Sequence, residues 1–172
     1  NSHNKIKFGL ISTFHNFQPG SAVGLGAASF FTAYSVPKNY ALESGIYLNN
    51  EQSIGKRWKL KYGLRFSLFN NIGKGTIYNY NNEFVKIDST VYPSGEIFNT
   101  YSGLETRLGI TYLLNEKSSV KASYSRNYQY IHLASNSTAG TPLDVWFPSS
   151  PNIKPQIGDQ FALGYFRNFR GN

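Results

Sequence analysis

Residues 58–68, WKLKYGLRFSL, alternate without interruption between two kinds of side chain. The first kind is apolar and comprises Trp58, Leu60, Tyr62, Leu64, Phe66 and Leu68. The second kind is polar or small and comprises Lys59, Lys61, Gly63, Arg65 and Ser67. Because successive side chains of a β-strand point to opposite faces, this period of two predicts a strand with one apolar face and one cationic face. Alternation alone leaves open whether the apolar face packs in a core or contacts lipid.

The composition favours strands along the whole chain. Aromatic residues make up 16% and charged residues 15% of the 172 residues, whereas soluble domains have roughly 25% charged residues. Tyr, Phe, Val, Ile and Thr are enriched in strands, and Gly and Asn are frequent in turns. The chain has no cysteine, and His3, His15 and His132 lack metal-ligand spacing. We therefore expect no disulfide, no metal site and no cofactor.

The net charge of +8 comes from basic residues that are spread along the chain and never form a basic run. This distribution argues against a nucleic-acid-binding protein, whose Lys and Arg residues cluster. No stretch approaches the roughly 18 consecutive apolar residues that a membrane helix needs. A membrane-spanning β-strand, however, requires only alternating hydrophobicity over about ten residues.

Six segments have the alternation expected of strands: residues 5–17, 37–50, 58–69, 102–114, 119–132 and 156–169. Short turns follow the second and fourth segments, whereas long connections span residues 18–36, 70–101 and 133–155. In an antiparallel meander this order places all three long loops at one end. Such asymmetry is typical of outer-membrane barrels, and a compact soluble domain rarely has structureless loops of this length.

Strand length and aromatic placement agree with a membrane barrel. Twelve residues at roughly 3.3 Å each span about 40 Å, or about 28 Å of the membrane normal at a tilt of about 45°. Trp58, Tyr112 and Tyr124 lie near the short turns, where an interfacial girdle is expected. Ordinary packing of aromatic residues in a sheet is the alternative explanation.

Arg126 conflicts with this assignment, because it shares the face of Val120, Ala122 and Tyr124. An Arg at the middle of a bilayer costs about 2–4 kcal/mol, and the cost falls towards zero near the interface. We therefore expect either that the strand has left the hydrocarbon by residue 126 or that a bulge switches the face.

The runs LKYGLRFSLF (residues 60–69) and YSGLETRLGITYLLNEKSSVKASYSRNYQYIHL (residues 101–133) resemble the barrel of TonB-dependent receptors of Gram-negative bacteria. The shared pattern is a strand with Gly-x-Arg, a Glu-Pro-Arg strand, a short turn and a Lys-Ala-Ser-Tyr-Ser strand. Thr106 stands where the family often has Pro. The run from Leu133 to Phe169 resembles the next loop and strand, so the resemblance covers all six segments.

The resemblance implies an all-β fold, an antiparallel up-and-down transmembrane barrel of about 22 strands that is closed by an N-terminal plug domain. We expect this chain to supply about six of the strands, with the plug and the TonB-binding motif lying outside it. The implied function is import of a scarce nutrient, such as chelated iron, a glycan, a peptide or a cofactor, across the cell outer membrane without enzymatic activity. The implied partners are outer-membrane lipid and lipopolysaccharide, TonB through the N-terminal part, a surface lipoprotein and the nutrient.

Two other classes of protein remain open on the residues alone. A soluble β-sandwich or small-barrel ligand-binding module would bury the apolar faces as a core. A hydrolase embedded in a barrel would need a nucleophile, a base and an orienting group at one site, and the sequence shows no such set.

The polar face contains six charged residues that we expect to face the lumen: Glu43, Lys59, Lys61, Arg65, Glu105 and Arg107. Opposite charges on neighbouring strands can neutralise each other, and this is the interpretation we favour. The alternative is that these residues guide a ligand or gate its passage.

The connection 133–155 is the candidate for ligand recognition. Its candidate residues are Asn136, Asp144, Trp146 and Phe147. Exposed aromatic rings beside hydrogen-bonding groups suit sugars, peptides or chelates. Alternatively, the run PLDVWFPSSP folds back onto the neighbouring loops and stiffens them.

Overall fold

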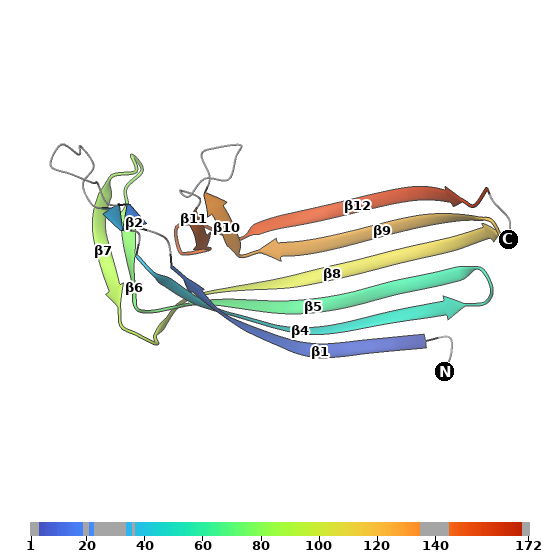
Figure 1. Cartoon of the computed structure of the whole chain (residues 1–172), viewed down its shortest axis with the longest axis horizontal. Helices are drawn as coiled ribbons and strands as arrows, with labels where there is room; N and C mark the ends of the chain where they lie inside the picture. The colour runs from blue at the N-terminus through green and yellow to red at the C-terminus, as the bar shows by residue number, and fades with distance from the viewer. Residues whose placement is uncertain (1–3, 19–20, 23–33, 36, 135–144, 170–172) are drawn as a thin grey trace.

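The computed structural model describes residues 4–18, 21–22, 34–35, 37–134 and 145–169. Six long strands form one antiparallel sheet in the order β1-β4-β5-β8-β9-β12 (Figure 1). Their bounds are β1 (Asn4–Phe17), β4 (Asn39–Ile54), β5 (Trp58–Ile72), β8 (Ile97–Asn115), β9 (Ser118–Gln129) and β12 (Gln156–Arg167). The all-β, up-and-down antiparallel architecture expected from the alternation is thereby confirmed. Among the described residues, no helix is long and apolar enough to cross a bilayer.

Three small hairpins lie at one end of the sheet, and the two short turns lie at the other (Figure 1). The hairpins are β2 (Ser21–Ala22) with β3 (Tyr34–Ser35), β6 (Gly75–Tyr80) with β7 (Lys86–Tyr92), and β10 (Ile131–Ala134) with β11 (Val145–Pro148). The short turn between β4 and β5 contains Gly55 at a φ of 60°, a conformation that glycine adopts without steric cost.

Several elements differ from the segments expected from the sequence. The connections 70–101 and 133–155 contain paired strands, because each has enough alternating residues to form a hairpin of its own. The segment 119–132 is divided near Tyr130, where the chain leaves the main sheet. Pairing between β8 and β9 already stops at Arg107 and Ser125, and β10 then pairs with β11 instead.

One face of the sheet, called the apolar face below, consists of aligned apolar side chains. In one row, Leu10 pairs with Ile46, Ile46 with Phe66, and Phe66 with Leu104. Leu10 is 80% exposed and Phe66 is 43% exposed. Within the described residues the apolar face is therefore not the interior of a closed core, contrary to what the soluble sandwich requires.

The apolar side chains lie progressively nearer the short turns from β1 to β12. On β1 they extend to Phe14, which pairs with Leu42 on β4. On β12 the continuous apolar run begins at Phe161, which pairs with Tyr124, and Ile157 lies apart from it beyond Asp159. A diagonal apolar band is what tilted strands of a barrel wall present to a membrane.

Arg126 keeps its place on the apolar face and is neutralised there. It pairs with Asp159 in an uninterrupted β9–β12 ladder, so no bulge switches its face. Its Nε and Nη2 donate to Asp159 Oδ1 and Oδ2, both at 2.8 Å, and Tyr124 Oη also donates to Oδ1 at 2.8 Å. The position lies at the long-loop border of the apolar band, where a paired guanidinium costs little.

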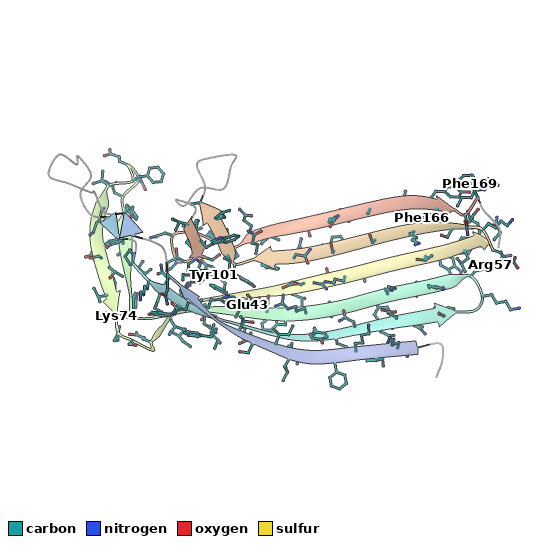
Figure 2. All side chains as sticks on the ribbon, in the orientation of Figure 1. Glu43, Arg57, Lys74, Tyr101, Phe166 and Phe169 are labelled. Atoms are coloured by element: carbon teal, nitrogen blue, oxygen red, sulfur yellow. The ribbon has the colours of Figure 1, made fainter. Side chains whose placement is uncertain are left out.

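Aromatic side chains gather at the short-turn end. The rings of Trp58 and Tyr112 lie 4.5 Å apart between centroids, and Arg57 Nη1 donates to Tyr112 Oη at 3.5 Å. Figure 2 shows Arg57 and Phe166 at this end of the sheet, far from Tyr101 near the hairpins. Trp58 and Tyr112 thus have the position of an interfacial aromatic girdle, whereas Tyr124, expected near the same end, lies farther along β9, where it contacts Asp159.

Candidate functional site

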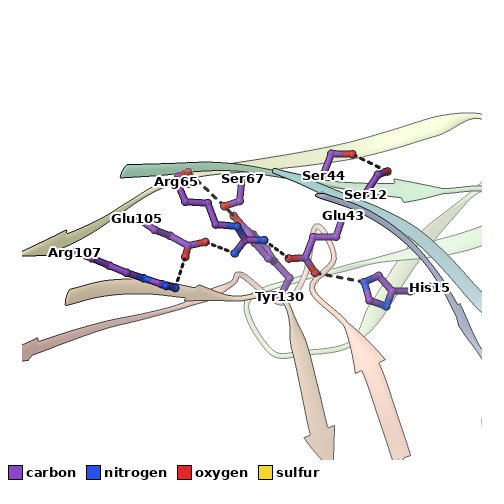
Figure 3. A network of polar contacts seen from close by, with 10 residues as sticks. Ser12, His15, Glu43, Ser44, Arg65, Ser67, Glu105, Arg107 and Tyr130 are labelled. Carbon is purple, nitrogen blue, oxygen red and sulfur yellow. Dashed lines mark hydrogen bonds and ion pairs between the residues drawn. The ribbon is translucent and has the colours of Figure 1, made fainter. Parts of the chain in front are cut away.

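A charged network occupies the middle of the opposite face, called the polar face below (Figure 3). Arg65 on β5 is its centre: Nη1 donates to Glu105 Oε1 on β8 at 2.8 Å, and Nη2 donates to Glu43 Oε1 on β4 at 3.0 Å. Glu105 is the direct cross-strand partner of Arg65. The Arg65 side chain passes over Gly45 to reach Glu43, and a Cβ added at Gly45 would lie 3.0 Å from Arg65 Nε. Glycine at this position therefore leaves the space that the arginine occupies.

Two further residues extend the network at its ends. His15 Nε2 on β1 lies 3.4 Å from Glu43 Oε2, and Arg107 Nη2 on β8 lies 3.9 Å from Glu105 Oε2. Glu105 is only 2% exposed. Burying a carboxylate is costly unless an opposite charge pairs with it, and Arg65 and Arg107 both supply such a charge. The contacts of Glu43, Arg65, Glu105 and Arg107 are thus mainly with one another.

The lysines of the polar face lie nearer the short turns and do not join this network. Lys61 Nζ lies 3.7 Å from Glu51 Oε1, and Lys7 Nζ lies 3.9 Å from the same oxygen. Lys59 shares their face and forms no ion pair within the described residues. Sequence reasoning missed Glu51 because the expected strand stopped at residue 50, whereas β4 continues to Ile54. Continued alternation beyond residue 50 is the signal that could have identified it.

The β10–β11 hairpin folds against the polar face at the long-loop end. Tyr130, directly before β10, stacks on Phe69 of β5 with ring centroids 4.9 Å apart and an interplanar angle of 5°. Its Oη lies 2.8 Å from Ser67 Oγ. Together with Phe17 and Ala41, these rings form a small buried cluster within the described part of the chain. Burial raises the pKa of the Tyr130 phenol above its ordinary value.

Ser149, directly after β11, is fully buried and forms hydrogen bonds on the other side of the hairpin. Its backbone nitrogen donates to Tyr130 O at 2.7 Å. Its carbonyl oxygen accepts from Asn71 Nδ2 at 2.8 Å, and its Oγ lies 2.9 Å from His132 Nε2. Next to it, Tyr101 Oη donates to Ser150 O at 2.8 Å. The hairpin is therefore bonded to both β5 and β8 rather than projecting freely.

The structure describes two of the four recognition candidates in this loop. Trp146 is 57% exposed and pairs with Leu133 across the hairpin. Phe147 is half-buried, with its ring 5.5 Å from that of His132. Asn136 and Asp144 lie outside the described residues. The packing agrees with a loop that folds back and stiffens its surroundings, and it still leaves the indole of Trp146 accessible.

The described residues include no group of three or more His, Asp or Glu side chains placed to hold a metal ion. One polar hollow in the polar face has a volume of about 470 Å³ and lies among the lysines and Arg107, on the short-turn side of the Arg65 network. The face thus combines a neutralised network, a cationic hollow and an inward-folded hairpin. Such a surface can bind a polar solute, whereas the serine–histidine contact in the hairpin, between Ser149 Oγ and His132 Nε2, is buried away from it.

A protein-family model described as TonB dependent receptor-like, beta-barrel matches residues 3–172 of the chain. No curated protein and no solved structure matches it.

Proposed function

Because the chain belongs to the TonB-dependent receptor-like β-barrel family, which consists of outer-membrane transport receptors, we propose that its six strands form part of the wall of a nutrient-importing receptor. The cargo is a scarce, bulky nutrient such as chelated iron, a glycan, a peptide or a cofactor. TonB engages the receptor through its N-terminal part, and the apolar band contacts outer-membrane lipid and lipopolysaccharide. A surface lipoprotein that covers the loops belongs to the same proposal.

The observation that carries the proposal is the contrast between the two faces. Leu64 and Phe66 are 52% and 43% exposed on the apolar face, whereas Arg65, between them, lies within an ion-pair network on the polar face. Exposed apolar residues in a diagonal band suit lipid. Paired charges suit the interior of a barrel, which is polar. We therefore assign the polar face to the lumen.

The remaining features fit the same placement. The three hairpins share the end opposite the short turns, which makes them extracellular by the usual orientation of such barrels. Trp146 then lies at the mouth, where an exposed indole can contact cargo. In the described residues β1 and β12 each pair on one side only, so further strands of the barrel pair with their free edges.

Spin labelling tests the assignment of the faces, and the lack of cysteine in the chain simplifies it. A nitroxide is attached to Leu64→Cys on the apolar face or to Ser123→Cys on the polar face, in receptors within outer membranes. We expect the label at position 64 to collide mainly with molecular oxygen, which concentrates in lipid. The label at position 123 should collide mainly with a water-soluble nickel chelate.

The reverse pattern would show that the faces are assigned the wrong way round. Equal shielding of both labels would point to the soluble sandwich, in which position 64 is part of a packed core. Release of the receptor into buffer without detergent would exclude the membrane wall altogether.

A further inference from the structure

Strand β8 extends well beyond the point where β9 stops pairing with it. The β8–β9 ladder ends at Arg107 and Ser125, whereas β8 continues to Ile97 and keeps its pairing with β5 (Figure 1). Within the described part of the chain, residues 97–106 of β8 therefore have no partner strand on the β9 side. This opening lies inside the sheet, between two of its own strands, and not at an outer edge where the rest of the barrel joins.

Backbone groups of β8 and β9 are directed towards each other across this opening. Leu113 N donates to Arg57 O on the β5 side at 2.8 Å. Because hydrogen-bonding direction alternates along an antiparallel strand, the even-numbered residues of β8, such as Leu104, direct N–H and C=O towards β9. The same alternation turns the even-numbered residues of β9, such as Tyr128, towards β8. If the ladder continued in its present register, Leu104 would lie opposite Tyr128, and no bulge would be needed.

The end of β9 instead places its side chains over the polar face of β8. Gly103 of β8 is buried on that face. A Cβ added to Gly103 would lie 2.7 Å from ring atoms of Tyr128 and 2.9 Å from Tyr130 Oη. The missing side chain of Gly103 thus provides the space that the two tyrosines occupy. From this position the Tyr130 ring stacks on Phe69, and the β10–β11 hairpin follows it onto the polar face.

Several contacts that hold the hairpin are polar and can be exchanged for others. Tyr130 Oη lies 2.8 Å from Ser67 Oγ, and Asn71 Nδ2 donates to Ser149 O at 2.8 Å. If the hairpin left the polar face, water would reach Ser67 and Asn71, so neither would remain buried without a partner. In return, the backbone groups of β8 would gain partners. Continued pairing would also set Tyr130 opposite Ser102 on the outer face, near the border of the apolar band, where aromatic side chains are favoured.

We propose that the end of β9 and the β10–β11 hairpin form a gate with two positions. In the first, seen here, the hairpin lies on the polar face at the long-loop end. In the second, residues 126–130 pair with residues 102–106 of β8, and the hairpin is displaced from the polar face. The inference deepens the proposed function and rests on the polar face lining the lumen, because displacement uncovers the wall around Ser67 and Asn71 at the mouth. Cargo that contacts one position better than the other shifts the balance between them.

Distances between two nitroxide labels follow the gate in the intact receptor within outer membranes. The labels are attached to Leu64→Cys on β5 and to Ala134→Cys at the end of β10. Both positions are exposed, and neither substitution removes a contact that holds the hairpin. Pulsed electron paramagnetic resonance then reports the distribution of distances. We expect two populations, of which the larger corresponds to the hairpin on the polar face.

Two glycines of β8 supply a matched pair of variants. Gly103→Ala places a Cβ in the space of the Tyr128 ring, so the displaced population should rise several-fold. Gly109→Ala lies on the same strand and face, but its Cβ would meet nothing closer than 3.7 Å, and the distances should match those of the parent receptor. Asn71→Leu removes the hydrogen bond to Ser149 O without touching β8, and it should also increase the displaced population.

A disulfide identifies the second position of the gate. In a receptor with Leu104→Cys and Tyr128→Cys, the two thiols come within disulfide reach when β9 pairs with β8 as a direct cross-strand pair. In the first position they point to opposite faces of β8, because Tyr128 covers Gly103 on the polar face. Oxidation should therefore link them, but more slowly than it links Ile110→Cys with Ala122→Cys, which already face each other in the ladder.

Three outcomes would overturn the proposal. A single distance population that both Gly103→Ala and Asn71→Leu leave unchanged would show that the hairpin has one position. A 104–128 disulfide that does not form, while the 110–122 disulfide does, would show that β9 never joins the upper part of β8. An equal shift in Gly109→Ala would remove the dependence on the tyrosine rings. If the labels at positions 64 and 123 still assign the faces as proposed, each of these results refutes the gate alone and leaves the barrel wall intact.

Discussion

Replacing Arg65 with Met should destabilise the barrel by leaving the Glu105 carboxylate buried without its main partner. Arg65 holds Glu105 at 2.8 Å and Glu43 at 3.0 Å, and Glu105 is 2% exposed. Met retains most of the aliphatic stem of Arg, so the packing beside Gly45 is disturbed little. The loss is therefore mainly electrostatic.

The expected magnitude follows from the burial of the pair. Removing one partner of a buried ion pair costs about 3–5 kcal/mol. Two features reduce this figure: the Arg65 side chain is 23% exposed, and Arg107 remains 3.9 Å from Glu105. We expect the free energy of unfolding to fall by about 2–3 kcal/mol.

The assay is urea unfolding of the intact receptor in detergent micelles, followed by the difference in gel mobility between folded and unfolded barrels. Lys59→Met is the matched control, because Lys59 occupies the same strand and face but forms no ion pair within the described residues. The urea concentration at the unfolding midpoint of Lys59→Met should stay close to that of the parent protein. Adding Glu105→Leu to Arg65→Met should recover much of the loss, since the unpaired carboxylate is then gone.

An Arg65→Met receptor that unfolds at the same urea concentration as the Lys59→Met control would refute this reasoning. An Arg65→Met, Glu105→Leu double variant that is less stable than Arg65→Met alone would also refute it. Either result would mean that water or another part of the receptor already solvates Glu105.

Three further predictions concern the hairpin, the outer face and a close contact. Tyr130→Ala should loosen the β10–β11 hairpin and speed its cleavage by an external protease. Tyr130→Phe loses only the hydroxyl contact, so it should lower the unfolding free energy by about 1 kcal/mol and leave cleavage slow. Asp159→Asn should lower the urea concentration at which the barrel unfolds, because Arg126 loses its bidentate partner. Adding Arg126→Gln should restore that stability, and failure to do so would contradict the pairing. Gly9→Val should destabilise the β1–β4 pair, since its Cβ would lie 2.7 Å from Tyr47 Oη, and Tyr47→Ala should relieve the clash in the same urea assay.

The order and sidedness of the strands could be inferred from the chain because they depend on local patterns. Alternation in residues 58–68 defines two faces whatever the partner strands are, since a period of two is a property of one strand. The sequence of long and short connections likewise determines which end carries the loops in any antiparallel meander. Both inferences agree with the β4–β5–β8 part of the sheet.

The contacts within the candidate site depend on register, which no single segment contains. Arg65 meets Glu105 because the β5–β8 ladder places them opposite each other after the β6–β7 hairpin. Register also places Asp159 opposite Arg126, and Asp159 lies on a strand that begins after the β10–β11 hairpin. A shift of one residue in either ladder would turn each partner to the other face.

What the sequence alone determined is thus the strand-rich composition, the two-faced strands, the placement of the loops and the resemblance to one receptor family. Tertiary structure alone decided that the hairpin turns inward. Tyr130 has the same parity as Tyr124 and Arg126, so simple alternation would place its ring on the apolar face. Instead the chain leaves β8 after Ser125, and the ring stacks on Phe69. The stack, the Ser149 hydrogen bonds and the pairing with β11 together outweigh continued pairing with β8, and these contacts join residues far apart in the sequence.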